Sequence, residues 1–224
     1  MPTVLIAGAS RGIGLELARQ YAADGWHVIG TRRNARGESA LRSAGAEPRR
    51  LDVSDASQFE ALAASLAGSS LDLFIHSAGI YGPDTSGLAQ PDEQAFEEIM
   101  RVNVLAAMCS MSSIGPLVAR AGGRMVYLSS SMGSIAQMNG TYGWLYRTSK
   151  AALNAALKCT AGELGRRGVT CLALHPGWVR TDMGGPNASI DVVTSVTGMR
   201  RVIAAARKKD NGRFLDYTGA EIPW

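Results

Sequence analysis

The sequence predicts an α/β protein in which a doubly wound, mostly seven-stranded parallel sheet carries helices on both faces. Short apolar stretches alternate along the chain with stretches of helical periodicity, as in strands joined by crossover helices. Glycine is abundant, with 26 residues against 8 prolines, which indicates tight turns rather than disorder. The length of 224 residues suits one hydrophobic core, so we expect a single domain spanning residues 1–224.

The first expected strand is an apolar run at residues 3–7, which a glycine-rich turn joins to a helical pattern. Six further strands are expected at 27–31, 47–51, 71–76, 124–129, 169–175 and 213–215, each separated from the next by helical periodicity. Crossovers between parallel strands are almost always right-handed, which places helices on both faces of the sheet. Ligands bind outside the carboxyl ends of such strands, so the segments that follow them form the candidate site.

Charge and composition argue against several classes of protein. The chain has 23 Lys and Arg against 19 Asp and Glu without a basic run, so no nucleic-acid partner is expected. It starts without a positively charged leader and has no uninterrupted apolar run of about 18 residues, so no membrane association is expected. Cys109, Cys159 and Cys171 stand in apolar stretches and are expected to be reduced and buried, which favours a cytoplasmic protein.

The turn after the first strand contains Gly8, Gly12 and Gly14 at the spacing G-x-x-x-G-x-G. Glycines let the backbone turn tightly and approach a pyrophosphate, whose negative charge the free N–H groups of the following helix favour. The turn therefore predicts dinucleotide binding of the Rossmann type. The alternative is a glycine turn that only packs a helix on a strand.

The end of the second strand points to one form of the cofactor. A carboxylate usually stands there when the ribose 2′-hydroxyl is free, but here Arg32 and Arg33 follow Gly30-Thr31. Arg32, together with Arg11 from the glycine turn, could hold a 2′-phosphate by charge-assisted hydrogen bonds. NADP(H) is therefore expected rather than NAD(H), whereas Arg33 alone fits a solvated charge equally well.

Tyr146 and Lys150 stand four residues apart at the start of an alanine-rich helical pattern, which places them on one helix face. A phenol with an ordinary pKa of about 10 exchanges protons poorly at neutral pH, and a neighbouring ammonium lowers that pKa by favouring the phenolate. The pair is therefore a candidate acid and base. A Tyr and a Lys at this spacing are also common on solvated helix faces.

These features belong to a longer series that resembles the classical short-chain dehydrogenase/reductase family over the whole chain. The series runs, in the family's order, through Gly8-x-x-x-Gly12-x-Gly14, Asp52-Val53, Ala78-Gly79, Asn103, Ser129-Ser130, Tyr146-x-x-Ser149-Lys150 and Pro176-Gly177. Within the family, the chain is most similar to the C-factor and sniffer-type carbonyl reductases. Four segments carry this similarity: Gly133-Ser134-Ile135, residues 146–154, residues 176–185 and the closing Ile222-Pro223-Trp224.

The resemblance implies a role for each member of a catalytic set. Tyr146 would donate a proton to a substrate carbonyl, or accept one from an alcohol in the reverse direction. Lys150 would tune Tyr146 and bind the nicotinamide ribose, and Ser130 would orient the carbonyl oxygen. Asn103 would hold a water that connects Lys150 to solvent. The cofactor itself would supply the hydride.

The resemblance also implies the cofactor site and the partners. Asp52 and Val53 match the family's adenine contacts, and Gly177, Val179 and Thr181 match residues that line the nicotinamide. The expected cofactor-binding residues are Gly8, Ser10, Arg11, Gly12, Ile13, Gly14, Arg32, Asp52, Val53, Ala78, Gly79, Lys150, Pro176, Gly177, Val179 and Thr181. The partner would be a small carbonyl or alcohol substrate, and the assembly a homodimer or homotetramer, although some members of this type act as monomers.

The sequence departs from the family pattern at two places. His76-Ser77 replaces the usual Asn-Asn after the fourth strand, which puts the side-chain bonds bracing this strand end in doubt, although both residues can donate and accept. Tyr146 stands 16 positions after Ser130, more than the family's commonest interval, so the loop 134–145 is long. Among the three consecutive serines the resemblance implies Ser130, because it stands three residues before Gly133, as in the family.

Two functions stay open after this comparison. The first is an NADPH-dependent reductase of ketones or aldehydes, with a small apolar-walled pocket under a lid at residues 183–196. The second is a cofactor-binding, C-factor-like signalling or regulatory protein with weak or vestigial reductase activity. Because a purely regulatory protein could lose Tyr146 or Lys150 freely, their joint presence favours the enzyme.

The remaining notable residues fit structural roles. His27 and His175 lie in apolar strands and are expected in the core or at strand ends, and no metal site is expected. Glu97 and Glu98 fit a solvated helix face. Four residues at near-helical spacing fit core packing first and a subunit interface second: Met100, Leu105, Met108 and Met111.

Overall fold

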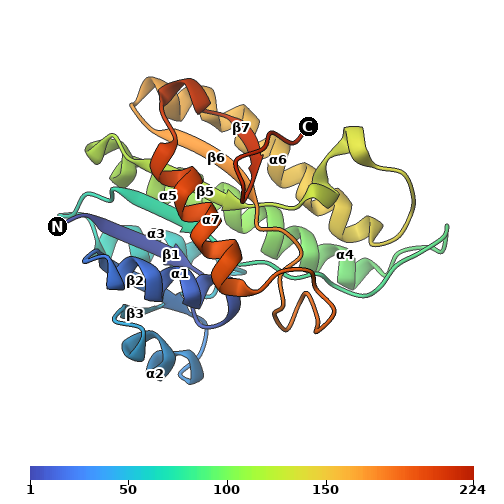
Figure 1. Cartoon of the computed structure of the whole chain (residues 1–224), viewed down its shortest axis with the longest axis horizontal. Helices are drawn as coiled ribbons and strands as arrows, with labels where there is room; N and C mark the ends of the chain where they lie inside the picture. The colour runs from blue at the N-terminus through green and yellow to red at the C-terminus, as the bar shows by residue number, and fades with distance from the viewer.

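All 224 residues are described by a computed structural model (Figure 1). Seven parallel strands form one sheet in the order β3-β2-β1-β4-β5-β6-β7. The strands are β1 (Thr3–Ala7), β2 (His27–Arg32), β3 (Glu47–Arg50), β4 (Leu73–His76), β5 (Arg124–Leu128), β6 (Thr170–His175) and β7 (Arg213–Asp216). Their bounds agree with the expected ones to within two residues, and the expected fold class is confirmed.

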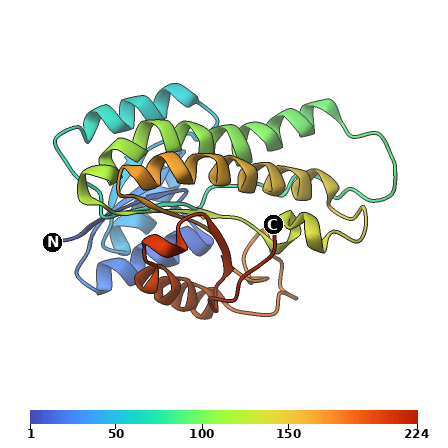
Figure 2. The same cartoon turned by 90° about the horizontal axis from the view of Figure 1, so that it is seen from above.

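Helices cover both faces of the sheet (Figure 2). They are α1 (Gly12–Ala23), α2 (Arg36–Ser43), α3 (Ala56–Ser65), α4 (Glu93–Met100), α5 (Ala106–Ala121), α6 (Trp144–Arg166) and α7 (Val192–Ala205). One face carries α3, α5 and α6, and the other carries α1, α2 and α7. In the strand order β3-β2-β1-β4-β5-β6-β7, the direction in which the chain adds strands reverses between β1 and β4. This reversal opens a crevice at the carboxyl ends of these two strands.

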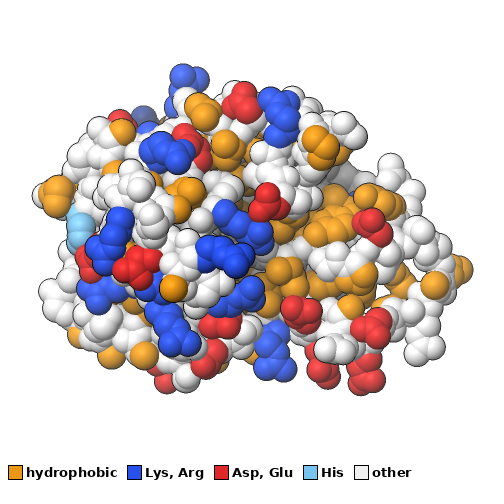
Figure 3. Space-filling view, turned by 90° about the horizontal axis from the view of Figure 1, so that it is seen from below, with side chains coloured by type: hydrophobic (Ala, Val, Ile, Leu, Met, Phe, Trp, Pro, Cys, Tyr) orange, Lys and Arg blue, Asp and Glu red, His pale blue; other side chains and the backbone are white.

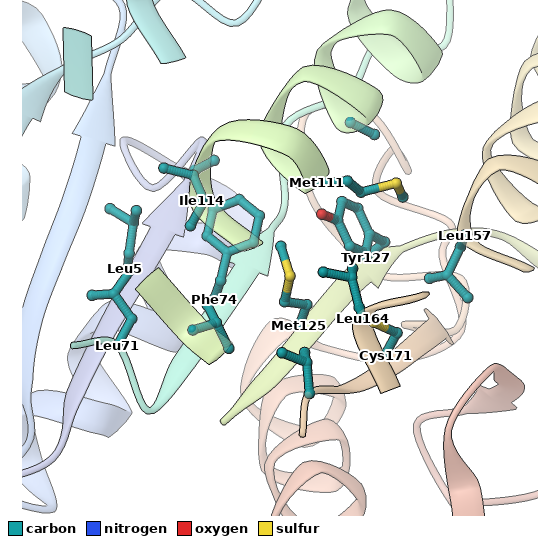
Figure 4. Close-up of a cluster of buried hydrophobic side chains, with 14 of the residues drawn as sticks. Leu5, Leu71, Phe74, Met111, Ile114, Met125, Tyr127, Leu157, Leu164 and Cys171 are labelled. Carbon is teal, nitrogen blue, oxygen red and sulfur yellow. The ribbon is translucent and has the colours of Figure 1, made fainter. Parts of the chain in front are cut away.

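Each layer of helices buries its own apolar cluster against the sheet. Alternate side chains of a strand point to opposite faces, so Leu5 packs under α3 and α5 whereas Val4 and Ile6 pack under α1 and α7. Figure 4 shows part of the first cluster, in which Phe74, Met125 and Tyr127 of the sheet face Met111 and Ile114 of α5. The inner strands β1, β4, β5 and β6 are mostly apolar because both of their faces are buried, whereas the edge strand β3 is polar and only partly buried.

The helical stretch Glu93–Ala121 is long and apolar enough to cross a membrane, with a mean hydropathy of 1.6 in its most apolar window. Its apolar residues Met111, Ile114 and Val118 are buried among the strands and α3. The hydropathy of this stretch is therefore accounted for by its place as a core helix.

Two expectations about buried residues need correction. Cys171 is buried and Cys109 is half-buried, but Cys159 is exposed on α6, so the three free thiols do not all lie in the core. Likewise, Met111 is buried whereas Leu105 and Met108 are about half exposed, at 46% and 49%. A helical spacing of apolar residues identifies a face approximately, and packing against α3 and α6 covers only part of that face.

Candidate active site

A cavity of about 950 Å³ lies at the crevice between β1 and β4. The segments that follow six of the strands, β1 to β6, contribute to its wall, together with the start of α6. Fifteen expected site residues line it: Gly8, Ser10, Arg11, Gly12, Ile13, Gly14, Arg32, Asp52, Val53, Ala78, Gly79, Tyr146, Lys150, Pro176 and Thr181. Asn103, Ser130, Gly177 and Val179 are close in the fold but do not form this wall. The cavity is large enough for an extended nucleotide ligand.

Two positions of the glycine turn, Gly8 and Gly14, leave no room for a side chain. Gly8 has φ +81°, and a Cβ on it would lie 2.7 Å from the backbone nitrogen of Ala78. A Cβ on Gly14 would lie 2.2 Å from the carbonyl oxygen of Gly8. These contacts bring the turn, the start of α1 and the end of β4 together with bare backbone facing the cavity.

The start of α1 differs from the starts of three other helices. Asp55, Asp92 and Asp191 cap α3, α4 and α7 by accepting a hydrogen bond from a backbone N–H in the first turn. At α1 the N-cap is Arg11, and no side chain accepts from the first N–H groups. The uncapped amides and the positive end of the helix dipole therefore remain available to an anion beside the glycine turn.

Arginines crowd the end of the cavity next to β2 and α2. Arg32 and Arg33 line the cavity with Arg36, and Figure 3 shows basic side chains gathered beside a hollow with hydrophobic walls. Arg32 forms an ion pair with Glu38 of α2, and Arg11 pairs with Asp182 at 2.8 Å. No carboxylate stands directly after β2, as the sequence predicts, but Glu38 reaches the same guanidinium from α2.

The loop after β6 closes the opposite side of the cavity. Gly177 has φ +85°, and the chain then turns so that Val179 is buried and bridges to Ile190. The Thr181 side chain lies against the glycine turn, with Cγ2 3.5 Å from where a Cβ on Gly12 would stand. The loop after β6 and the glycine turn are nearly 170 residues apart in sequence, and they lie on the two sides of one cleft.

Tyr146 and Lys150 both lie in the first two turns of α6 and point into the fold, with exposures of only 8% and 4%. The Lys150 ammonium lies 5.6 Å from the centroid of the Tyr146 ring. Its Nζ donates a 2.9 Å hydrogen bond to the carbonyl oxygen of Leu128, at the end of β5. The helical spacing seen in the sequence therefore places both side chains at the carboxyl end of the sheet.

Burial shifts the pKa of both side chains in the direction that favours the uncharged form. It raises the pKa of Tyr146 to about 12, against the smaller lowering effect of a hydrogen bond with Ser130. It also lowers the pKa of Lys150 to about 8. The direction for Tyr146 is opposite to the one predicted from a neighbouring ammonium, because loss of solvation by burial is the main cause of the shift.

The three consecutive serines after β5 have different surroundings. Ser129 donates a 2.6 Å hydrogen bond to Asn154, and Ser131 begins a short helical turn, Ser131–Gly133. Ser130 lies beside the Tyr146 phenol and also accepts a 3.1 Å bond from the backbone nitrogen of Met132. Ser130 is thus the serine that lies next to Tyr146, and its catalytic role stays a prediction.

Asn103 lies in a π-helical turn, Arg101–Leu105, between α4 and α5. Its amide accepts from the backbone nitrogen of Ile80 at 2.9 Å and donates to the Ile80 carbonyl oxygen at 2.8 Å. It also donates to Ser149 Oγ at 2.9 Å. The side chain thus braces the segment after β4 against α6, and its polar atoms already have protein partners.

His76 does not brace the end of β4 as a hydrogen-bonding residue. Its ring is buried against Phe59, Phe74 and Tyr127, and neither ring nitrogen has a hydrogen-bond partner. Burial lowers its pKa to about 3. His175 is placed at the end of β6 as expected, and His27 pairs with Glu47 near the sheet edge.

Three residues near the site were not predicted from the sequence. Glu38 binds the guanidinium of Arg32, and Tyr81 packs its ring 4.8 Å from the ring of Tyr146. Asn154 contacts the serine segment after β5. Only Asn154 had a usable signal, because it follows Tyr146 and Lys150 at the same helical spacing of four residues.

The fold and this site define a class, the α/β oxidoreductases that bind a dinucleotide at the switch point of a parallel sheet. The chain belongs to the short chain dehydrogenase family, whose model matches residues 2–191. The resemblance to this family seen in the sequence is thereby confirmed.

Individual relatives cover most or all of the chain. The C-signal protein of Myxococcus xanthus is 37% identical over 165 residues, which are 73% of this chain and 99% of that protein. The carbonyl reductase Sniffer of D. melanogaster is 28% identical with a TM-score of 0.94, covering 100% of both chains. The NADPH-bound carbonyl reductase from chicken fatty liver is 30% identical with a TM-score of 0.91, covering 100% of this chain and 94% of that one.

Proposed function

We propose that this protein is an NADP(H)-dependent reductase that transfers hydride to a ketone or aldehyde, and reversibly oxidises the alcohol, with Tyr146 as general acid and base. One observation carries the proposal: Tyr146 and Lys150 line the cavity that also contains the bare glycine turn, and Ser130 lies beside the Tyr146 phenol. The NADPH-bound chicken carbonyl reductase, with the same fold over the whole chain, supports it.

The residues of the cavity fit the cofactor. The uncapped amides of α1 and the close approach enforced at Gly8 and Gly14 suit a pyrophosphate. Arg32 and Arg11 suit a 2′-phosphate, since the guanidinium fork pairs with phosphate oxygens. Asp52 and Val53 would hold the adenine, and Thr181 and Lys150 would lie at the nicotinamide end. When bound, the reduced nicotinamide supplies the hydride.

The chain's own residues would manage the proton. A pKa of about 12 keeps the Tyr146 phenol protonated at neutral pH, so it is ready to donate to a developing alkoxide. Ser130 would donate a hydrogen bond to the same oxygen and hold it in place. Lys150, whose pKa is about 8, carries its charge at neutral pH. It would stabilise the phenolate that the Tyr146 side chain becomes after it donates its proton.

The test is a screen of ketones and aldehydes that follows NADPH oxidation, repeated with Tyr146→Phe. Losing a positioned acid costs about 10²- to 10⁴-fold in turnover, whereas NADPH affinity should stay nearly unchanged. Tyr21→Phe is a suitable control, because Tyr21 is also buried with its pKa raised to about 12 but lies on the α1 and α7 face. A Tyr146→Phe enzyme with most of its activity would refute the assignment.

A second candidate function follows from the similarity to the C-signal protein, which extends over 99% of that protein. A signalling or regulatory protein would use the cofactor-bound fold as a surface and would not need the proton donor. A Tyr146→Phe variant that binds NADPH normally separates the two functions, because it should keep a regulatory effect and lose a catalytic one. A cytoplasmic location and a homodimeric or homotetrameric assembly remain part of the proposal.

A further inference from the structure

Three buried side chains on one face of α6 reach the same short segment after β5. Tyr146, Lys150 and Asn154 follow one another at intervals of four residues and are exposed by 8%, 4% and 3%. Their polar ends lie against residues 128–133, the segment that contains Ser130. The proposed function uses the first two, and Asn154 has no part in it so far.

Asn154 binds this segment on both sides of Ser130. Its Oδ1 accepts a 2.6 Å hydrogen bond from Ser129 Oγ, and its Nδ2 donates to the Gly133 carbonyl oxygen at 3.3 Å. Between these two points the chain makes a turn closed by a 2.8 Å bond from Gly133 N to the Ser130 carbonyl oxygen. One amide group therefore holds both ends of the turn that carries Ser130.

The turn is also pressed against α6. A Cβ on Gly133 would lie 2.8 Å from the backbone carbon and the Cβ of Lys150, so the two backbones are in contact. Ser129 and Asn154 are both buried, and loss of the amide would leave buried polar groups without partners. The turn would then shift to recover hydrogen bonds, and a displacement of about 1 Å at a reacting group can cost about 100-fold in rate.

We propose that Asn154 is a positioning residue that fixes the Ser130 hydroxyl relative to Tyr146. The proposal rests on the function proposed above, in which Ser130 orients the substrate carbonyl. Asn154 acts only through the turn 129–133 and touches neither substrate nor cofactor. Its effect should therefore appear in turnover rather than in NADPH affinity, and it should depend on the presence of Ser130.

The experiment is a double-mutant cycle between Asn154→Leu and Ser130→Ala. The NADPH-loaded protein is mixed with a ketone or aldehyde found active in the screen described above. Its single-turnover reduction is followed by nucleotide fluorescence, so that slow variants remain measurable. Asn154→Leu should lower the rate about 10- to 100-fold in the otherwise unchanged protein, and less than about twofold when Ser130 is already Ala. The NADPH dissociation constant should change by less than about twofold in either background.

Two further variants keep the test decisive. Ser129→Ala breaks the 2.6 Å bond without altering α6, and it should lower the rate in the same Ser130-dependent way even if Asn154→Leu folds poorly. Asn211→Leu is the control, because Asn211 also joins two elements through bonds to Cys171 N and Ala161 O, away from the site. It should lower the melting temperature and leave the rate of the folded protein within about twofold.

Equal losses in both backgrounds, or no loss in either, would overturn the positioning role. If Ser130→Ala alone leaves the rate unchanged, the role of Ser130 in the proposed function fails. That outcome differs from an impaired Ser130→Ala protein in which the Asn154→Leu effect is simply additive, which rejects only the role of Asn154.

Discussion

The Lys150 ammonium donates a hydrogen bond to the Leu128 carbonyl oxygen at 2.9 Å, which joins the second turn of α6 to the last residue of β5. The bond holds the charged group at the carboxyl edge of the sheet, near both the Tyr146 ring and Gly79 in the segment after β4. A Cβ on Gly79 would lie 3.5 Å from Nζ, so the lysine also occupies space that a larger residue there would fill.

We expect Lys150→Ala to weaken NADPH binding and to move the pH dependence of alcohol oxidation to higher pH. The ammonium would bind the nicotinamide ribose and favour the phenolate, so its loss removes both effects. The measurements are a fluorescence titration of NADPH and a pH profile of turnover. Lys158→Ala, two further turns along α6, should alter neither.

The two parts of this prediction can fail separately. Unchanged NADPH affinity together with lost turnover would remove the ribose role of Lys150. A pH profile that stays in place would remove the electrostatic role and leave Lys150 as a lysine that joins α6 to β5.

Arg32→Asp should shift the cofactor preference from NADPH toward NADH. The guanidinium at the end of β2 would pair with a 2′-phosphate, whereas a carboxylate there repels the phosphate and can accept from a ribose hydroxyl. Each tenfold change in the ratio of the two dissociation constants corresponds to about 1.4 kcal/mol. Titration of both nucleotides checks it.

Arg42→Asp provides the control for this prediction. The Arg42→Asp substitution changes the charge by the same amount, on α2. Arg42 pairs with Glu38 at 2.9 Å, but it does not line the cavity. If Arg42→Asp shifts the preference as much as Arg32→Asp does, the effect is one of overall charge. An unsubstituted protein that binds NADH as tightly as NADPH would contradict the assignment directly.

His76 should make the protein sensitive to acid. Burial lowers its pKa from 6.5 to about 3, so between these values the unfolded chain binds a proton that the folded protein does not. The free energy of unfolding therefore falls as the pH drops from about 6.5 toward 3, by up to about 1.4 kcal/mol per pH unit from this residue.

The measurement is urea unfolding of the protein and of His76→Leu at several pH values from 7 to 4. Whatever the packing change does to the stability of the variant at pH 7, its loss of stability with acid should be shallower. His27→Gln, which alters a half-exposed ring, serves as the control. Parallel pH dependences for His76→Leu and the unsubstituted protein would show that His76 is not responsible.

Local sequence determined the order of the elements and much of the site. Apolar runs marked the inner strands because both faces of the sheet are buried there, and the absence of a carboxylate directly after β2 could be read from Thr31, Arg32 and Arg33. The shared face of Tyr146 and Lys150 followed from helical geometry alone. These properties depend on residues at most a few positions apart, so they can be predicted without knowledge of the fold.

Tertiary structure decided the rest. Glu38 next to Arg32, Tyr81 on Tyr146 and the partnerless ring of His76 all depend on how separate segments meet. The exposure of Cys159 likewise depends on what packs on α6.

The pKa of Tyr146 shows the physical reason most plainly. The sequence places an ammonium four residues away and predicts a lowered pKa, but burial by distant parts of the chain raises it to about 12. Solvation, unlike helical spacing, is set by every segment that covers a group, and only the folded chain determines which segments those are.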